Sequence, residues 1–556
     1  MRSSRLTAIT AAAFALATPA AALAAPGDTT LVSRASGPAG AIASDSVFYA
    51  QLSGDASTVA FATEAENLSG FDDDGSADVF ARSLATATTS LISAGENPVP
   101  FSPDVGGDDS SGSPAINGDG RFVAFSSGAT NFSDDDEDTA HDVFVRDRLT
   151  GETELVSRDD GENGDPADAD SHRPSISADG RFVAFESEAT NLSNADEDGS
   201  TDIFVRDRQL HQTTLISHRN LNGGDDDSTH ATISPDGDTI AFYSQATNLA
   251  DNDQDAINDV FVGSIDHGTT ELISRSTFGN AANAGPNTSA ALALSADGNR
   301  VAFISDASNL APGDGPSVDV FIRDRAAQTT TLGSPGNAQS FLPSLSADGT
   351  KLAFHSYADN LHPDDPDGTS DVFVRDLTTG ETSLESRTSA GVKGDGPSSS
   401  VTISADGKTI AFRSTAANLG ALFGGQTFVR ELPQPAAPAG PAGPTGQPSG
   451  DPGTTPSTGA TTTPKPKLRK AGRLALGKTG SRCISKKRLR LRLKLVGATP
   501  GVKIVRVQVR VGERTLRFKG TKPVVRKLNR TPKTIRITAT TSLGTKVTLK
   551  KRFRGC

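Results

Sequence analysis

Two short apolar runs, separated by polar loops, recur along most of the chain. The first run is Val-Ala-Phe-like, with an Asn six residues after its Phe, and the second is Asp-Val-Phe-Val-like. The copies follow one another at a mean spacing of about 58 residues, a period that indicates a repeat protein in which each copy is one supersecondary unit. The seven first-run Phe residues are Phe61, Phe125, Phe185, Phe242, Phe303, Phe354 and Phe412.

Each repeat is predicted to form four short strands, A to D. Strand A ends in Ser-x-Asp-Gly, strands B and C are the two apolar runs, and strand D reads Thr-x-Leu-Val-Ser. Asp-Gly separates A from B in six repeats, from Asp119-Gly120 to Asp406-Gly407, and accepts the positive φ of a tight hairpin turn. Strands B and C are nearly continuously apolar, as expected for strands buried between neighbouring sheets. The recurring Asn is expected to bond local backbone and close a turn.

The two ends of the repeat region predict a closed ring. Residues 30–34 read as a strand D without its repeat, whereas the seventh repeat stops after Arg430 and lacks strand D. The N-terminal strand would therefore complete the last blade and remove the open sheet edges. The predicted fold class is all-β, with a seven-bladed β-propeller of four-stranded blades closed by the N-terminal strand.

The repeat motifs resemble the TolB-like β-propeller repeats of exported bacterial proteins. Those blades also read Ser-x-Asp-Gly, then a Val-Ala-Phe-like strand, then Asp-Val-Phe-Val, and the resemblance covers about residues 28–430. It departs from TolB itself, which has six blades and an α/β domain before them. The resemblance thus implies the propeller architecture and an exported location, but not the role of TolB in envelope transport.

The remaining sequence predicts three further segments. Arg2 and Arg5, an Ala-rich apolar run and a small-residue site at 22–24 indicate a signal peptide at 1–24. A membrane anchor is the alternative, but the apolar run is short for an anchor. Lipid attachment is not indicated, because there is no Cys near the cleavage site. We expect a secreted, periplasmic or cell-surface protein, with a propeller at 28–431, a Pro/Gly/Thr-rich linker at 432–466 and a small β-sandwich at 467–556.

The C-terminal module is opposite in charge to the rest of the chain. From Lys465 onward there are 30 Lys and Arg against the single acid Glu513, which leaves 24 bases and 66 acids elsewhere. Alternating apolar and basic residues in this module resemble the strands of immunoglobulin-like modules of bacterial surface proteins. Its two cysteines, Cys483 and Cys556, are the only ones in the chain and predict a disulfide in an exported protein. Metal binding by two isolated Cys is a weaker alternative.

The loops between strands B and C carry the candidate chemistry. Repeats two and four read Asp-x-Asp-x-Asp-x-x-x-Asp, and such alternating carboxylates can converge on Ca²⁺, which takes six to eight oxygen ligands. The alternative is a solvated acidic loop. Repeats one and six retain part of the pattern, at Asp72, Asp74, Asp78 and at Asp365, Asp367, Asp371. The predicted ligands are Asp134, Asp136, Asp138 and Asp142, then Asp196, Asp198 and Asp202, then Asp251, Asp253, Asp255 and Asp259.

The sequence favours a binding or scaffold protein over an enzyme. It has no Gly-x-Ser-x-Gly elbow, its eight His show no metal-ligand spacing, and we expect no paired set of His, Tyr or Arg on strands A. With strand A innermost, the B–C and D–A loops emerge on one face, the loop face, which is strongly acidic. We expect it to repel nucleic acid and to bind a protein or a cell-surface polymer; the basic C-terminal module is one candidate partner. The alternative is a propeller hydrolase or lyase acting on polysaccharide.

Overall fold

The computed structural model describes most of the repeat region and the backbone of the strands that follow it. Described are residues 26–433, apart from 71–74, 96–104, 134, 137, 196–198, 220–221, 252, 254, 266, 286–290 and 316, and strands between 473 and 555. The chain divides into two compact units, 1–440 and 441–556. The predicted signal peptide and most of the predicted linker lie outside the described residues.

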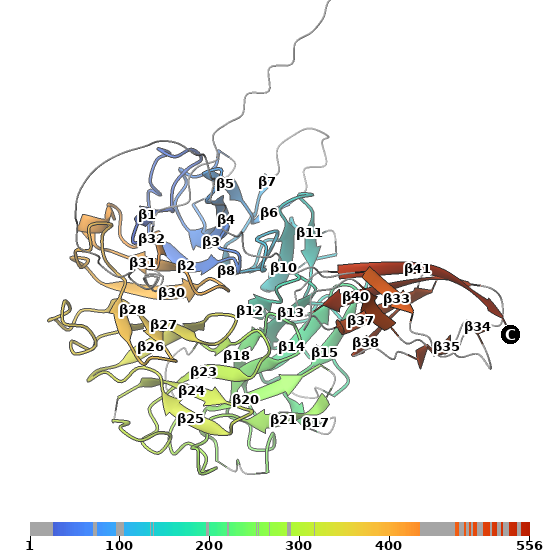
Figure 1. Ribbon diagram of the computed structural model, residues 1–556. Helices are drawn as coiled ribbons and strands as arrows, with labels where there is room; N and C mark the ends of the chain where they lie inside the picture. Colours follow the sequence, from blue (N-terminus) through green and yellow to red (C-terminus); the bar gives the residue numbers. More distant parts are fainter. Residues whose placement is uncertain are drawn as a thin grey trace, which may run out of the picture. The chain divides into compact units, whose positions relative to one another are not determined.

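The first unit contains seven four-stranded antiparallel sheets in its described part, which confirms the predicted blades (Figure 1). Blades 1 to 3 are β2 (Val47–Leu52), β3 (Thr58–Thr63), β4 (Asp78–Ser83), β5 (Thr88–Leu91); β8 (Ser111–Ile116), β9 (Phe122–Ser127), β10 (Asp142–Asp147), β11 (Thr153–Leu155); and β12 (Ser171–Ile176), β13 (Phe182–Ser187), β14 (Asp202–Asp207), β15 (Gln212–Leu215). Blades 4 and 5 are β18 (Ser228–Ile233), β19 (Ile240–Ser244), β20 (Asp259–Ser264), β21 (His267–Leu272); and β22 (Ala293–Leu294), β23 (Arg300–Ser305), β24 (Asp319–Asp324), β25 (Thr329–Leu332). Blade 6 is β26 (Ser340–Leu345), β27 (Lys351–Ser356), β28 (Asp371–Asp376) and β29 (Thr382–Leu384).

The last blade is closed by the N-terminal strand, as predicted. It consists of β30 (Ser398–Ile403), β31 (Thr409–Ser414), β32 (Gln426–Glu431) and β1 (Thr29–Leu31), and β1 pairs antiparallel with β32. Arg430 fixes this edge because its Nη1 donates to the Gly27 carbonyl at 2.6 Å and to Thr29 Oγ1 at 2.9 Å, while its Nε bonds buried Glu385 at 2.8 Å. Two short pairs, β6 (Ala94–Gly95) with β7 (Val105–Gly106) and β16 (His218–Arg219) with β17 (Asn222–Gly223), and one 3₁₀ turn, η1 (Ala417–Leu419), complete the elements.

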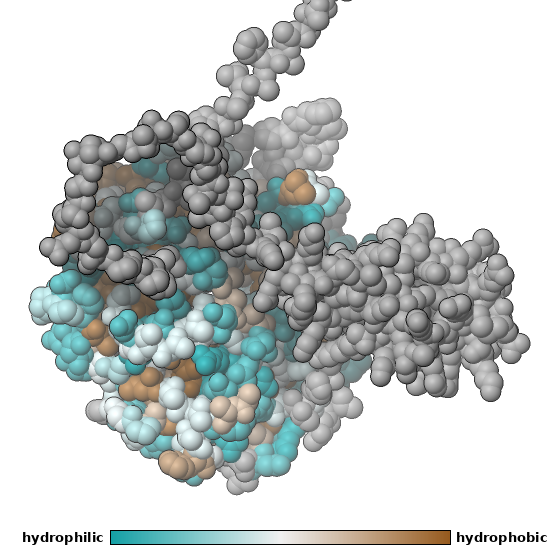
Figure 2. Space-filling view, in the orientation of Figure 1, coloured by the Kyte–Doolittle hydropathy of each residue, from teal (hydrophilic) through white to brown (hydrophobic). Residues whose placement is uncertain are grey.

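The core lies between blades and is built from the two apolar runs. In every blade the Phe of strand B stacks on the Phe of strand C; in blade 3 Phe185 and Phe204 pair across the strands with ring centroids 5.9 Å apart. Such pairs contribute about 0.5–1.5 kcal/mol each beyond the area they bury. On the face shown in Figure 2, the coloured hydrophobic residues form small patches among polar ones.

The turns between strands A and B join all seven blades around the axis. Their glycines adopt φ between +66° and +78°, as the Asp-Gly motif predicts, and Ala56 takes this conformation in blade 1. The residue after the turn-initiating Ser or Asn approaches its counterpart in the next blade so closely that a Cβ on Gly118 would lie 2.9 Å from the Ala178 carbonyl oxygen. Small residues are therefore required there. Seven backbone hydrogen bonds close the ring, Asp55 to Gly118, Gly118 to Ala178, Ala178 to Pro235, Asp236 to Ala296, Ala296 to Ala347, Ala347 to Ala405 and Ala405 to Gly54.

The second unit is formed by β-strands in its described part. One five-stranded sheet has the order β34 (Cys483–Ile484), β41 (Lys546–Gly555), β40 (Lys533–Thr541), β37 (Ile504–Val511) and β38 (Arg514–Lys519). The other pairs are β33 (Arg473–Leu476) with β36 (Leu493–Val496) and β35 (Leu489–Arg490) with β39 (Val524–Val525). Cys483 is in register with Arg554, and Cys556 lies outside the described residues, so the disulfide and the immunoglobulin-like sandwich stay predictions. In the described part of the chain, no helix has the length and hydrophobicity to span a membrane.

Candidate cation sites on the loop face

Six of the seven B–C loops end on an Asp that a Ser just after strand D holds in place. In blade 2, Ser157 Oγ donates to Asp142 Oδ1 at 2.5 Å and accepts the Val143 N–H at 2.9 Å. The same Ser–Asp pair forms in blade 6, from Ser386 to Asp371 at 2.6 Å. In blade 7 Ser33 from the N-terminal segment donates instead to Gln426, at 2.6 Å. The last acid of the loop motif therefore has a structural role through one oxygen, and its other oxygen can serve the loop.

Among the described residues, three B–C loops gather three carboxylates each. In every cluster one ligand atom per residue lies within 4.8 Å of the other two, the first and third residues are buried, and the second is exposed. The clusters are Asp136, Asp138 and Asp142 in blade 2, Asp253, Asp255 and Asp259 in blade 4, and Asp365, Asp367 and Asp371 in blade 6.

The clusters of blades 2 and 4 carry uncompensated negative charge. Asp253 is 3% exposed, and neither of its carboxylate oxygens has a hydrogen-bond partner among the described residues. Burial, followed by repulsion from Asp255, raises the pKa of Asp253 to about 6, and burial raises that of Asp259 to about 7. Asp136 and Asp142 in blade 2 repeat these shifts, to about 6 and about 7, for the same reason. Buried carboxylates of this kind need a proton or a cation.

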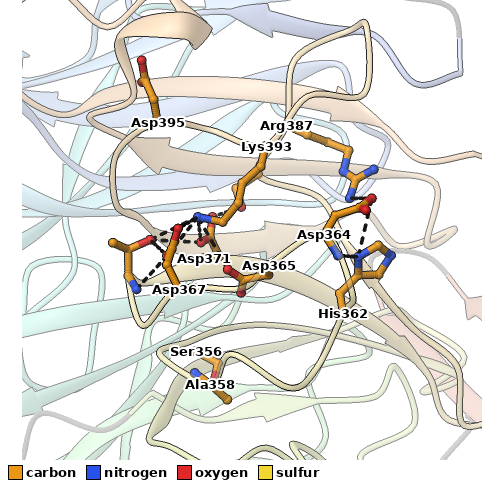
Figure 3. Close-up of polar contacts among 12 residues, drawn as sticks. Ser356, Ala358, His362, Asp364, Asp365, Asp367, Asp371, Arg387, Lys393 and Asp395 are labelled. Carbon is orange, nitrogen blue, oxygen red and sulfur yellow. Dashed lines mark hydrogen bonds and ion pairs between the residues drawn. The ribbon is translucent and has the colours of Figure 1, made fainter.

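The cluster of blade 6 has its own cation (Figure 3). Lys393 Nζ lies 2.8 Å from Asp371 Oδ2, 3.0 Å from Asp367 Oδ2 and 3.5 Å from Asp365 Oδ1. It also bonds Thr369 Oγ1 at 3.2 Å. Hydrogen bonds from Thr369 and Lys393 lower the pKa of Asp367 to about 2. The sequence analysis did not single out Lys393, because it lies in the next D–A loop, 22 residues after the last acid of its cluster.

The position of Lys393 has a direct counterpart in blades 2 and 4, where the residue is not a lysine. The D–A loops of blades 2, 4 and 6 share one bridge, in which an Arg pairs with Pro166, Ala281 or Lys393. The recurring Asn of the following blade then bonds the carbonyl of that residue. The three bonds are Asn191 to Pro166 at 2.7 Å, Asn309 to Ala281 at 2.8 Å and Asn418 to Lys393 at 2.8 Å. The Asn is thus structural, as expected, but it reaches about 25 residues back rather than closing a local turn.

The other predicted ligands are placed differently or lie outside the described residues. Asp134, Asp196 and Asp198 fall outside them. Asp202 begins β14 and accepts a hydrogen bond from Ser217 Oγ, as Asp142 does from Ser157. Asp251 forms an ion pair with Arg219 at 2.7 Å and is not part of the blade 4 cluster. In the shortened loop of blade 5, Asp314 is half-buried, its two oxygens have no hydrogen-bond partner among the described residues, and burial raises its pKa to about 6.

A second polar set lies on strands A and B of blades 3 and 4. Arg173 on β12 forms an ion pair with Glu186 on β13 at 2.6 Å, and Glu186 Oε2 also accepts the backbone N–H of His230 on β18 at 2.8 Å. The rings of His141 and His172 lie 5.0 Å apart. Arg173 and His230, which are 57 residues apart on the innermost strands of neighbouring blades, are thus linked through Glu186 on strand B, a connection that the sequence did not predict.

The backbone fixes this second set. Arg173 and His230 both have positive φ, +46° and +57°, at a bulge that recurs in strand A of six blades. A bulge turns one side chain of a strand out of the regular alternation. Burial lowers the pKa of both His172 and His230, so both rings are neutral at pH 7. Glu186 neutralises the charge of Arg173 and also bonds the backbone of His230, so this set of residues holds blades 3 and 4 together.

Comparisons with known proteins find partial alignments with solved TolB structures. No protein-family model matches the sequence, and no curated protein matches it. Among solved structures, TolB from Acinetobacter baumannii aligns with 16% identity and a TM-score of 0.34, over 59% of this chain and 66% of that one. A putative TolB from Agrobacterium tumefaciens aligns with 15% identity and a TM-score of 0.34, over 62% of this chain and 95% of that one. The chain spans just under two thirds of the first structure. By the order and pairing of its own seven sheets, the first unit is a β-propeller of the kind that the TolB-like repeat motifs predict.

Proposed function

We propose that the protein is an exported, non-catalytic β-propeller that binds a protein or a cell-surface polymer through its loop face, and that Ca²⁺ in blades 2 and 4 orders this face. The observation that carries the proposal is the cluster around Asp253. A carboxylate that is 3% exposed, without a hydrogen-bond partner among the described residues and beside two other carboxylates, is costly unless a cation compensates it.

The donor set suits a hard cation. Carboxylate oxygens are the ligands that Ca²⁺ and Mg²⁺ prefer, and backbone carbonyls or water can complete the six to eight positions of Ca²⁺. In blade 4 the ligands would be Asp253, Asp255 and Asp259, and in blade 2 Asp136 and its two partners. Mg²⁺ demands a nearly ideal octahedron and gives up its water reluctantly, so an irregular loop with three carboxylates favours Ca²⁺.

The partner of the loop face is proposed from charge. The propeller side of the chain carries 66 acids against 24 bases, whereas the segment from Lys465 onward carries 30 bases against one acid. An acidic face attracts basic proteins, and bound Ca²⁺ would let it also bridge to an anionic polymer. The basic C-terminal module is one partner of this kind within the chain.

The competing function is a hydrolase or lyase acting on extracellular polysaccharide. The set around Arg173, Glu186 and His230 is the observation that favours it, since the Glu186 carboxylate on strand B pairs with Arg173 and accepts the backbone N–H of His230, and both of these residues lie on innermost strands. Its direct test is activity of the purified protein on a panel of cell-wall and plant glycans. Turnover that is lost in Glu186→Gln but retained in Asp253→Asn would favour the enzyme.

The binding proposal is tested by thermal unfolding of the full mature chain in EDTA and in a Ca²⁺ series, with Mg²⁺ as the control ion. A ligand that binds only the folded state raises the midpoint by RT ln(1 + [L]/Kd), about 2.7 kcal/mol at 100 times Kd. We expect a selective, saturating rise with Ca²⁺. Coincident curves in EDTA, Mg²⁺ and Ca²⁺ would leave the acidic loops as a solvated face without a metal.

A further inference from the structure

We propose that Lys393 is a tethered cation, whose ammonium group takes the position in blade 6 that a divalent cation takes in blades 2 and 4. The inference rests on the proposed function and extends it to a third site. It implies that blade 6 needs no metal as long as Lys393 is present, and that removal of the ammonium group opens a new Ca²⁺ site formed by Asp365, Asp367 and Asp371.

The geometry places the ammonium group among the ligands rather than beside them. Its nitrogen reaches one oxygen from each carboxylate, at 2.8, 3.0 and 3.5 Å, and these three residues are the ones whose ligand atoms converge. Asp365 and Asp371 are buried, and the positive charge beside them is supplied by a side chain of the protein itself (Figure 3). An ammonium group has three donors, and Asp371, Asp367 and Thr369 offer acceptors within 3.2 Å, while Asp365 lies slightly farther away.

Two backbone features of the site recur in the three blades. The backbone N–H of the first cluster residue bonds the carbonyl three residues before it in each loop, Asp136 to Ser133, Asp253 to Ala250 and Asp365 to His362. The variable feature is the side chain at the bridge position of the D–A loop, which is Pro166, Ala281 or Lys393. Neither proline nor alanine can supply a charge. Blades 2 and 4 therefore have the carboxylates but no cationic side chain at the bridge position.

The charge that the lysine supplies is smaller than that of a divalent ion. One positive charge against three carboxylates leaves two negative charges, whereas Ca²⁺ would leave one. Asp365 shows the difference, because its oxygens have no hydrogen-bond partner although Lys393 lies 3.5 Å away. A buried site with residual negative charge retains an affinity for hard cations once the ammonium group is removed.

Blade 6 also borders the joint of the ring, which gives the tethered cation a use. The loop that carries Lys393 contacts the closing strand, since Thr29 Oγ1 donates to the Arg387 carbonyl at 2.6 Å and the Thr29 N–H donates to Ser389 Oγ at 2.9 Å. Asn418 of the last blade holds the Lys393 carbonyl at 2.8 Å. A built-in cation keeps this joint ordered without Ca²⁺.

The test is the number of Ca²⁺ ions bound by the full chain, measured by equilibrium dialysis for the wild type, Lys393→Gln and the control Lys408→Gln. Lys393→Gln removes the charge and keeps two of the four methylene groups of the lysine side chain. Lys408 forms an ion pair of similar length, 2.9 Å to Asp406, but at an exposed A–B turn. We expect one additional Ca²⁺ per chain for Lys393→Gln and no change for Lys408→Gln.

The outcomes separate this inference from the proposed function. If the wild type binds Ca²⁺ and Lys393→Gln binds no more, the tethered-cation inference is overturned and the sites of blades 2 and 4 stand. If the wild type binds no Ca²⁺, the proposed function falls, and this inference with it. Thermal unfolding guards against a folding defect, because the midpoint of Lys393→Gln should drop in EDTA and recover with Ca²⁺ by more than that of the wild type. A drop that Ca²⁺ does not reverse also counts against the inference.

Discussion

Replacing Asp253 by Asn should stabilise the protein without Ca²⁺, and the variant should lose this advantage over the wild type as Ca²⁺ fills the wild-type site. The substitution removes the charge of a carboxylate that lies buried beside Asp255 and Asp259 and lacks a hydrogen-bond partner among the described residues. The new amide can donate to those two carboxylates, whereas the original carboxylate only repels them. In most buried sites the loss of a charge destabilises a protein, so the opposite sign is diagnostic here.

The magnitude follows from the pKa of Asp253. Its rise from 3.8 to about 6 corresponds to about 3 kcal/mol of destabilisation of the folded state at pH 8, at 1.36 kcal/mol per pKa unit. The unfolding entropy of a propeller of roughly 400 residues is about 0.8 kcal/mol/K, so removing this cost raises the midpoint by about 3–4 °C. Saturating the wild-type site at 100 times Kd returns about 2.7 kcal/mol, which closes the gap between the two proteins.

The assay is differential scanning calorimetry at pH 8, in EDTA and across a Ca²⁺ series. Asp253→Asn should unfold above the wild type in EDTA and lose its advantage as Ca²⁺ rises past about 100 times Kd. The matched control is Asp238→Asn, which removes an exposed carboxylate of the same blade at its A–B turn and should leave both midpoints unchanged. A midpoint of Asp253→Asn that lies below the wild type by the same amount in both buffers would refute the reasoning.

Three further predictions concern pH and the ring closure. Because the pKa values of Asp253 and Asp259 are raised to about 6 and about 7, protons compete with Ca²⁺, and the midpoint gain from Ca²⁺ should shrink between pH 8 and pH 6; a gain that is constant over this range contradicts the sites. Burial lowers the pKa of His355 to about 4, below its ordinary 6.5. The stability that the neutral His355 contributes is therefore complete above pH 6.5 and is lost as the pH falls towards 4, by up to about 3 kcal/mol. His355→Phe should flatten the dependence of the unfolding free energy on pH between these values, measured by urea unfolding. Glu385→Gln leaves the buried Arg430 charge uncompensated at the closing strand and should cost about 3 kcal/mol in urea unfolding, and a change below 1 kcal/mol would show that the backbone carbonyls around Arg430 suffice.

The fold could be predicted from the sequence because its period is carried by side chains that pack the same way in every copy. A Phe on each of two neighbouring strands, an Asp-Gly turn and an Asn six residues after the first Phe recur with little variation, and each maps onto one structural contact. The closing strand was predictable for the same reason, since residues 30–34 repeat the strand D motif. The hydrogen bonds that join the A–B turns could not be predicted from the sequence. Gly118 and Ala178 are separated by a whole repeat, and only their small size indicates the contact.

The candidate sites were predictable only in part. Within one loop, alternating Asp residues indicate a cluster, and Asp253, Asp255 and Asp259 do meet. The partners of these acids come from D–A loops outside the motif. Lys393 lies in the D–A loop after blade 6, and Arg219, which pairs with Asp251, lies in the D–A loop before blade 4, so the sequence motif shows neither. A search for a lysine at the position of the recurring bridge could have found Lys393 once the repeats were aligned.

The blade with the tethered lysine and the blades without one differ in how the chain joins them to their neighbours in the ring. Blades 2 and 4 are joined by the chain to a neighbour on each side, so a loosened loop there leaves the ring closed. Blade 7 is completed by the three residues of β1, and local opening is expected to begin where such a short edge strand is held by few contacts. The loop carrying Lys393 contacts that strand, and a covalently attached ammonium group cannot dissociate when Ca²⁺ is depleted. The lysine thus lies beside the one joint whose opening would unfold the ring, and the carboxylate clusters without a lysine lie where loss of an ion would alter the loop face alone.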